Sequence, residues 1–168
     1  VPPDKLYATG IPLRREFELS CYDSTVWERY GLNSDLFTLM VMGGGCGLLS
    51  GVEDIIESLG ALDLPMQIVV VTGTNRTLAK KLGALSQSSR IPIVVLGYVE
   101  NTAELMEISQ LLLTKSGGVT IFEAMAKKLP MLLYSPLPGH EKSNTRFLLE
   151  RKAAILAKDQ QEVIEAII

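Results

Sequence analysis

The chain has 168 residues, of which 47% are hydrophobic, and a net charge of −3; this fits one domain with a full hydrophobic core and argues against nucleic-acid binding, which needs a basic surface. Cys21, Cys46 and the one histidine lack the spacing of a zinc site, so we expect two free thiols in a cytoplasmic protein. No apolar run is long enough to span a membrane, and no signal peptide is visible.

The first 35 residues differ from the rest of the chain in pattern. Residues 6–9 suggest a short strand, residues 10–14 (GIPLR) a turn-like segment, and residues 24–30 a helix. We interpret residues 1–30 as an entry segment from a preceding domain and residues 31–168 as one domain. The chain opens at Val1 without a methionine, which we take to indicate a fragment of a longer protein.

From residue 36 onward, strand-sized apolar runs alternate with helical stretches. Strands are expected at 36–42, 66–72, 91–96, 111–114, 131–134 and 154–157, and helices at 48–62, 75–86, 102–109, 119–128, 141–151 and 160–168. Continuous apolar strands with helices between them indicate a parallel sheet covered on both faces. The sequence therefore predicts an α/β fold with a doubly wound, six-stranded parallel sheet, in which ligands bind at the carboxyl ends of the strands.

A glycine-rich loop (GGGCG, residues 43–47) follows the first strand of this sheet. Glycines allow a backbone to approach a ligand closely, and the next helix offers free N–H groups that suit a phosphate. The Lys and Ser/Thr of a P-loop are absent, and the dinucleotide fingerprint lacks its last glycine. The second strand also ends without the acidic residue that NAD binding requires. A tight turn without a ligand remains the alternative.

A second cluster, residues 115–124 (KSGGVTIFEA), places two glycines at the start of a helix, after the fourth strand. Glu123 lies about one turn into that helix. Its charge there has two interpretations: a favourable interaction with the helix dipole, or a carboxylate that accepts hydrogen bonds from two ribose hydroxyls. The residues alone leave both open.

The cluster and its surroundings resemble a known family. Gly-Gly-x-Thr-x-x-Glu-Ala at 117–124, a strand, and Pro-Gly-His-Glu-x-x-Asn at 138–144 are similar to the C-terminal domain of glycosyltransferases with the B-type (GT-B) fold. The likeness is to monogalactosyldiacylglycerol synthases and processive diacylglycerol glucosyltransferases, and more distantly to the peptidoglycan N-acetylglucosamine transferase. Residues 9–14 resemble the interdomain segment of these enzymes, and residues 97–99 resemble the loop after the third strand.

The resemblance implies a UDP-sugar co-substrate, no cofactor and a donor site with assigned roles. Glu123 would hold the ribose, and the Tyr98–Val99 backbone would read the uracil edge. The remaining residues would contact the diphosphate or the sugar: Gly44, Gly45, Lys115, Gly117, Gly118 and Thr120 on the phosphate side, His140, Glu141 and Asn144 at the sugar hydroxyls, and Arg14 reaching the donor from the entry segment.

Two departures from the family pattern affect this assignment. Ser116 stands where many relatives have proline, and His140 where many have glutamine; the second change leaves the donor sugar open between glucose, galactose and N-acetylglucosamine. His140 itself could contact the sugar, lie on the surface or act as a general base.

The resemblance further implies an inverting, metal-independent transfer, because no Asp-x-Asp motif is present and helix N-termini could stabilise the leaving UDP. The catalytic base and lipid acceptor would belong to an absent N-terminal domain, which would also associate with the membrane. The fragment alone would bind donor but be inactive. Alternatives are the peptidoglycan enzyme, a nucleotide-sugar epimerase, a non-enzymatic nucleotide-binding module and a scaffold that binds no ligand.

Overall fold

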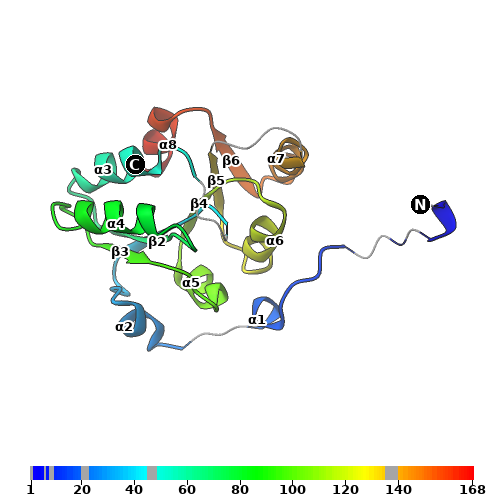
Figure 1. Cartoon of the computed structure of the whole chain (residues 1–168), viewed down its shortest axis with the longest axis horizontal. Helices are drawn as coiled ribbons and strands as arrows, with labels where there is room; N and C mark the ends of the chain where they lie inside the picture. The colour runs from blue at the N-terminus through cyan, green and yellow to red at the C-terminus, as the bar shows by residue number, and fades with distance from the viewer. Residues whose placement is uncertain (1, 6, 8–9, 20–22, 45–48, 135–139) are drawn as a thin grey trace.

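The computed structural model describes residues 2–5, 7, 10–19, 23–44, 49–134 and 140–168. Its six strands form one parallel sheet in the order β3-β2-β1-β4-β5-β6 (Figure 1). The strands are β1 Phe37–Met42, β2 Met66–Val71, β3 Ile93–Leu96, β4 Leu111–Thr114, β5 Met131–Tyr134 and β6 Ala154–Ala157. This order confirms the predicted doubly wound sheet.

Helices cover both faces of the sheet and create two hydrophobic cores. In β1, Leu39 and Val41 point to one core while Met40 and Met42 point to the other, as the two-residue period of a strand requires. One face carries α3 Val52–Gly60, α4 Arg76–Leu85 and α8 Gln160–Ile167; the other carries α1 Arg15–Glu18, α2 Val26–Tyr30, α5 Thr102–Ile108, α6 Gly118–Ala126 and α7 His140–Glu150.

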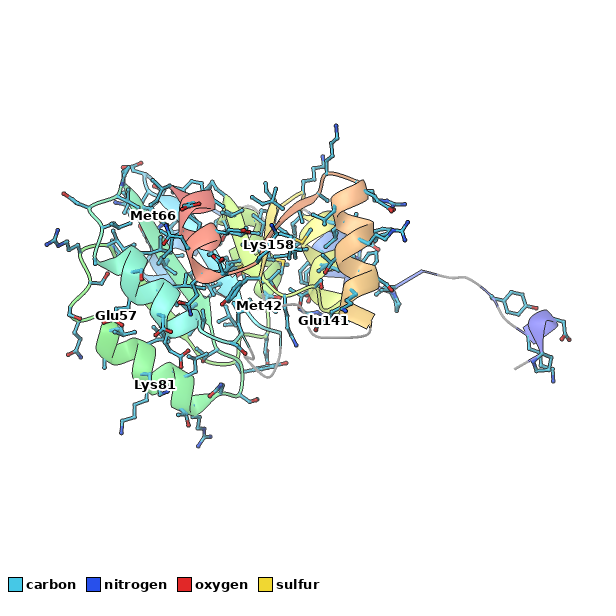
Figure 2. All side chains as sticks on the ribbon, turned by 90° about the horizontal axis from the view of Figure 1, so that it is seen from above. Met42, Glu57, Met66, Lys81, Glu141 and Lys158 are labelled. Carbon is cyan, nitrogen blue, oxygen red and sulfur yellow. The ribbon has the colours of Figure 1, made fainter. Side chains whose placement is uncertain are left out.

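The strand order reverses between β1 and β4, which are neighbours in the sheet. Met42 of β1 lies opposite Thr114 of β4, and the Thr114 hydroxyl donates a 2.6 Å hydrogen bond to the Met42 carbonyl. The chain leaves these two strands toward opposite faces, so a crevice opens beyond their carboxyl ends. In Figure 2, Met42 and Glu141 lie toward this edge of the sheet, and Met66 lies toward the opposite edge.

The entry segment is partly built into the domain. Its described elements are a 3-10 turn, Pro3–Lys5, and helices α1 and α2, and Phe17 and Val26 are buried in the core beneath α5 and α6. The Arg29 guanidinium joins α2 to α5 through a 2.7 Å ion pair with Glu104. The described residues before Leu13 extend away from the body in Figure 1. The strand predicted at 6–9 falls mostly outside the described residues, and Tyr7 is not in a strand.

Of the element boundaries that differ from the prediction, two have clear local reasons. The helix predicted from residue 48 begins at Val52, because Gly51 has a left-handed conformation with φ of 70° and ends the preceding turn. The strand predicted from residue 91 begins at Ile93, after Pro92. Proline has no N–H to donate to a sheet, so it is placed before the strand rather than inside it.

Candidate functional site

A cavity of about 310 Å³ lies at the carboxyl ends of the central strands. Six of the thirteen predicted site residues line it, although they come from distant parts of the sequence: Arg14, Gly44, Tyr98, Val99, Thr120 and Glu123. The lining consists of Arg14, Met42, Gly44, Val71, Gly73, Tyr98, Val99, Glu100, Thr102, Val119, Thr120 and Glu123. The switch in strand order thus creates the crevice, and the loops after β1, β2 and β3 with the start of α6 form its walls.

Glu123 is the buried acidic residue of this cavity. It lies on α6 and is buried, with only 6% of its surface exposed. Burial raises the pKa of its carboxyl above the usual value, and the Arg14 guanidinium partly offsets this shift. Among the described residues, one cation, Arg14, lies 3.7 Å from this carboxylate. This leaves acceptor capacity that suits a ligand with neighbouring hydroxyl groups.

Arg14 connects the entry segment to the cavity. Its Nη1 donates a 2.6 Å hydrogen bond to the Glu100 carbonyl, and its Nη2 lies 3.4 Å from the Thr102 hydroxyl and 3.7 Å from Glu123 Oε1. The guanidinium also stands 5.1 Å from the centre of the Phe17 ring. These contacts fix the guanidinium at the cavity, and Glu16, whose Oε1 lies 3.0 Å from Nη1, offsets part of its positive charge.

The N-terminus of α6 faces the same cavity. Gly117 is the N-cap residue, without a side-chain cap, and Gly118 is the first residue of the helix. The first N–H groups of a helix have no partner within it, and together with the helix dipole they attract anions. A Cβ atom added to Gly117 or Gly118 would meet no protein atom within 4 Å. Packing therefore does not require glycine here, and the space is open to a ligand.

A second group of predicted residues joins the loop before α6 to the start of α7. Lys115 Nζ forms a 3.2 Å ion pair with Glu141, and Asn144 Nδ2 donates a 2.9 Å hydrogen bond to the Ser116 carbonyl. Ser116 is fully buried; its hydroxyl lies 2.8 Å from both the Glu141 carbonyl and the Thr145 hydroxyl. Glu141 and Asn144 thus brace the glycine loop.

We expect Ser116→Ala to lower the free energy of unfolding by about 1–2 kcal/mol, because it removes two buried hydrogen bonds, while the Thr145 hydroxyl can still donate to the Glu141 carbonyl. Chemical denaturation measures the change. Ser88→Ala is the matched control, since the exposed Ser88 hydroxyl makes one local hydrogen bond to Leu85 and its loss should cost less than about 0.5 kcal/mol. Equal effects of the two substitutions would contradict the bracing role of Ser116.

Two other predicted site residues, Gly45 and His140, cannot be placed fully. Gly45 lies outside the described residues, and His140 begins α7 with a side chain that is not described. The sequence interpretation missed Gly73, Glu100 and Thr102 as lining residues. Their position directly after β2 and β3 was the available signal, because the carboxyl ends of parallel strands share one edge.

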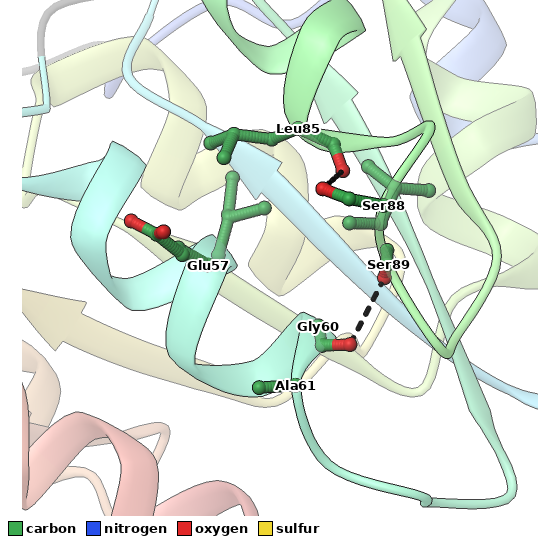
Figure 3. A pocket seen from close by; sticks show the side chains of 8 residues that line it. Glu57, Gly60, Ala61, Leu85, Ser88 and Ser89 are labelled. Carbon is green, nitrogen blue, oxygen red and sulfur yellow. Dashed lines mark hydrogen bonds between the residues drawn. The ribbon is translucent and has the colours of Figure 1, made fainter.

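A smaller cavity of about 160 Å³ lies between the end of α3 and the loop before β3 (Figure 3). Ser89 crosses it, donating a 3.3 Å hydrogen bond to the Gly60 carbonyl. This smaller cavity lies at the amino-terminal edge of the sheet, away from Glu123.

Within the described residues, no three His, Cys, Asp or Glu side chains gather to form a metal site, and no helix is long and apolar enough to cross a membrane.

Comparison with known proteins identifies relatives of the chain. The model of the glycosyltransferase family 28 C-terminal domain matches residues 38–168. The chain is 38% identical over 165 residues to a processive diacylglycerol beta-glucosyltransferase of Bacillus pumilus, covering 98% of this chain and 43% of that protein. The Bacillus subtilis enzyme of the same name matches with the same identity and coverage. The chain thus spans less than half the length of these curated relatives.

The fold also resembles the crystal structure of Acinetobacter baumannii MurG, with a TM-score of 0.66 and 18% identity, over 84% of this chain and 43% of that chain. Together with the strand order, this likeness confirms the predicted Rossmann-like, C-terminal half of a GT-B fold.

Proposed function

The chain belongs to the glycosyltransferase family 28 C-terminal domains, and from this premise we propose that it binds the UDP-sugar donor of an enzyme that transfers a hexose to a lipid such as diacylglycerol. The observation that carries the proposal is the placement of Glu123 and the N-terminus of α6 around one cavity. That arrangement offers an acceptor for hydroxyl groups beside donors for phosphate, which a nucleoside diphosphate requires.

The spacing of residues along α6 supports this orientation of the donor. Glu123 and Gly118 are five residues apart on α6, and a rise of 1.5 Å per residue separates them by about 7–8 Å along the axis. The ribose hydroxyls would bind Glu123 while the diphosphate lies at the helix N-terminus. The Tyr98–Val99 backbone would contact uracil, and the sugar would extend toward His140, Glu141 and Asn144.

The position of Glu123 on α6 argues against binding of a dinucleotide such as NAD. In NAD-binding domains an acidic residue at the end of the second strand holds the ribose. Here β2 is followed by Thr72, whose hydroxyl donates to the Leu96 carbonyl, and by Gly73. The acid comes instead from α6, beyond the fourth strand.

In the proposed reaction, the N–H groups of α6 stabilise the charge that grows on the leaving diphosphate. The basic side chains of the proposed site are Arg14, which donates to the Glu100 carbonyl, and Lys115, which is paired with Glu141. We propose an inverting transfer that requires no metal, with the base and the lipid acceptor supplied by the rest of the enzyme. Transfer by the full-length enzyme should therefore persist in a chelator, and its complete loss would overturn this part.

Calorimetric titration with UDP, UDP-glucose, UDP-galactose and NAD, all in chelator, tests the proposal. Binding of the uridine nucleotides with little affinity for NAD is the expected result, and a preference between the two sugars would identify the donor. Binding of NAD in preference to UDP would overturn the proposal. So would the absence of any uridine nucleotide binding both here and in the full-length enzyme.

The affinity for UDP-glucose should fall as the pH is lowered, because a protonated Glu123 loses acceptor capacity. Burial raises the pKa of this carboxyl, so the loss should begin at a higher pH than for an ordinary glutamate. UDP-glucose is the appropriate ligand because its phosphates are both esterified and do not titrate in this range. Titrations at successive pH values measure the effect, and Glu123→Gln should flatten the profile. An unchanged profile in that variant would contradict the role of Glu123.

A further inference from the structure

Two lysines have a left-handed backbone conformation at the edge of the sheet opposite the donor cavity. Lys128 follows α6 with φ of 55°, and Lys152 follows α7 with φ of 54°. They are the only non-glycine residues with positive φ in the described part of the chain. Both lie in the same kind of helix end: the amides of Lys128 and Leu129 bond back to Met125 and Ala124, and those after α7 follow the same pattern.

This position at a helix end is usually glycine, because a side chain there is disfavoured by steric contact with the backbone. A lysine near a helix C-terminus gains from the dipole, but earlier positions in the last turn offer that gain without the strain. The occurrence of two strained lysines at neighbouring helix ends therefore suggests a role for their side chains.

The two lysines line one groove. Its volume is about 280 Å³, and apart from Lys128 and Lys152 the residues that line it are apolar: Met125, Leu129, Pro130, Met131 and Ala153. Both lysines are exposed, and neither ammonium group has an ion-pair partner among the described residues. We call these seven residues the dibasic groove.

The nearby acidic residues Glu107 and Glu150 are paired with other cations, so they do not compensate the positive charge of the dibasic groove. Lys127 is paired with Glu107, and Glu150 is paired with Arg146. Arg151, next to Lys152, adds a further positive charge while its guanidinium stacks 3.8 Å from the centre of the Phe147 ring. A concentration of positive charge over an apolar floor, in a chain with a net charge of −3, favours an anionic and amphipathic partner.

We propose that the dibasic groove binds anionic phospholipid at a bilayer surface. The lipid phosphate lies between the two ammonium groups, and the apolar floor contacts the glycerol and the start of an acyl chain. A free phosphate ion would contact the two lysines but not the apolar residues of the groove. A phospholipid would contact both, and for this reason we favour the lipid. This site is separate from the donor site, because the donor cavity lies at the N-terminus of α6 and the dibasic groove lies at its C-terminus.

Cosedimentation with vesicles tests the proposal. We expect the chain to bind vesicles of mixed phosphatidylglycerol and phosphatidylcholine, and to bind phosphatidylcholine alone much more weakly. The double variant Lys128→Gly/Lys152→Gly should bind the anionic vesicles about ten- to thirtyfold more weakly, since each lysine near an anionic surface contributes a few-fold to the affinity. Glycine suits the left-handed conformation, so the variant should fold at least as stably as the parent.

The matched control is Lys80→Gln/Lys158→Gln, which removes two exposed lysines from α4 and from the turn before α8. It should lose little vesicle binding, and both double variants should keep the UDP affinity of the parent. Equal losses in the two double variants, or undiminished binding by the glycine variant, would overturn the proposal. Displacement of the chain by inorganic phosphate, at an ionic strength matched with chloride, would also overturn it by indicating a simple anion site.

Discussion

Glu123→Gln should lower the affinity for UDP by about ten- to a hundredfold, while the fold remains intact. The carboxylate is buried in the cavity, and a hydrogen bond to a charged group contributes about 1.5–3 kcal/mol. Glutamine has nearly the same shape but is neutral and has one acceptor oxygen, so it cannot accept a hydrogen bond from each ribose hydroxyl on a separate oxygen. Calorimetric titration measures the change, and an unaltered affinity would remove Glu123 from the donor site.

The stability of this variant separates a role in binding from a role in folding. Because the folded-state pKa of Glu123 is raised, its stabilising contribution is greatest below the unfolded-state pKa. That contribution is lost as the pH rises through the folded-state value. Glutamine stays neutral at every pH, so the variant should be at least as stable as the parent near neutral pH. Glu57→Gln, an exposed acid on α3, is the control and should leave UDP affinity unchanged.

Gly118→Ala should also reduce UDP affinity, by about tenfold or more, because the added methyl group occupies the space reserved for the diphosphate. The protein itself offers no obstacle, since no atom lies within 4 Å of that methyl position. Stability should therefore be unchanged or rise by up to about 1 kcal/mol, as for glycine-to-alanine changes in compatible backbone. The measurements are thermal denaturation and calorimetric titration of the same preparation.

Gly83→Ala provides the matched control for this substitution. Gly83 lies within α4, away from the cavity, and a methyl group there would also meet no atom within 4 Å. Alanine in a helix interior is favoured by about 1 kcal/mol over glycine, so this variant should be more stable and bind UDP normally. If Gly118→Ala also bound UDP normally, the diphosphate would not lie at the N-terminus of α6.

The sheet could be predicted from the sequence because its signals are local. Residues 66–71 and 111–114 are mainly apolar runs of strand length. The helical stretches that connect such strands favour a parallel sheet. The boundary at Gly51 required backbone detail, whereas the one at Pro92 could have been predicted from the missing proline N–H. The left-handed conformation of Lys128 and Lys152 could not be foreseen, because glycine is the residue that usually marks such a position.

The position of the candidate site could likewise be predicted, but its internal contacts could not. Residues after strands β1 to β4 had to meet at one edge of the sheet. The contact of Arg14 with Glu123 and the hydrogen bond from Asn144 to Ser116 join segments that are distant in sequence, and they depend on how the helices pack. The sequence interpretation assigned Asn144 to the sugar. The structure shows its amide bracing the loop, so any sugar contact would be additional.

The most direct test of the donor site is an NMR titration of the nitrogen-15-labelled chain with UDP, following the backbone amides. We expect shift changes that concentrate at Val99, Gly118, Val119 and Thr120, which surround the cavity or begin α6, and that weaken in Glu123→Gln. Changes confined to the smaller cavity lined by Ser89 or to the dibasic groove would contradict binding of UDP at α6, as would no change at millimolar UDP.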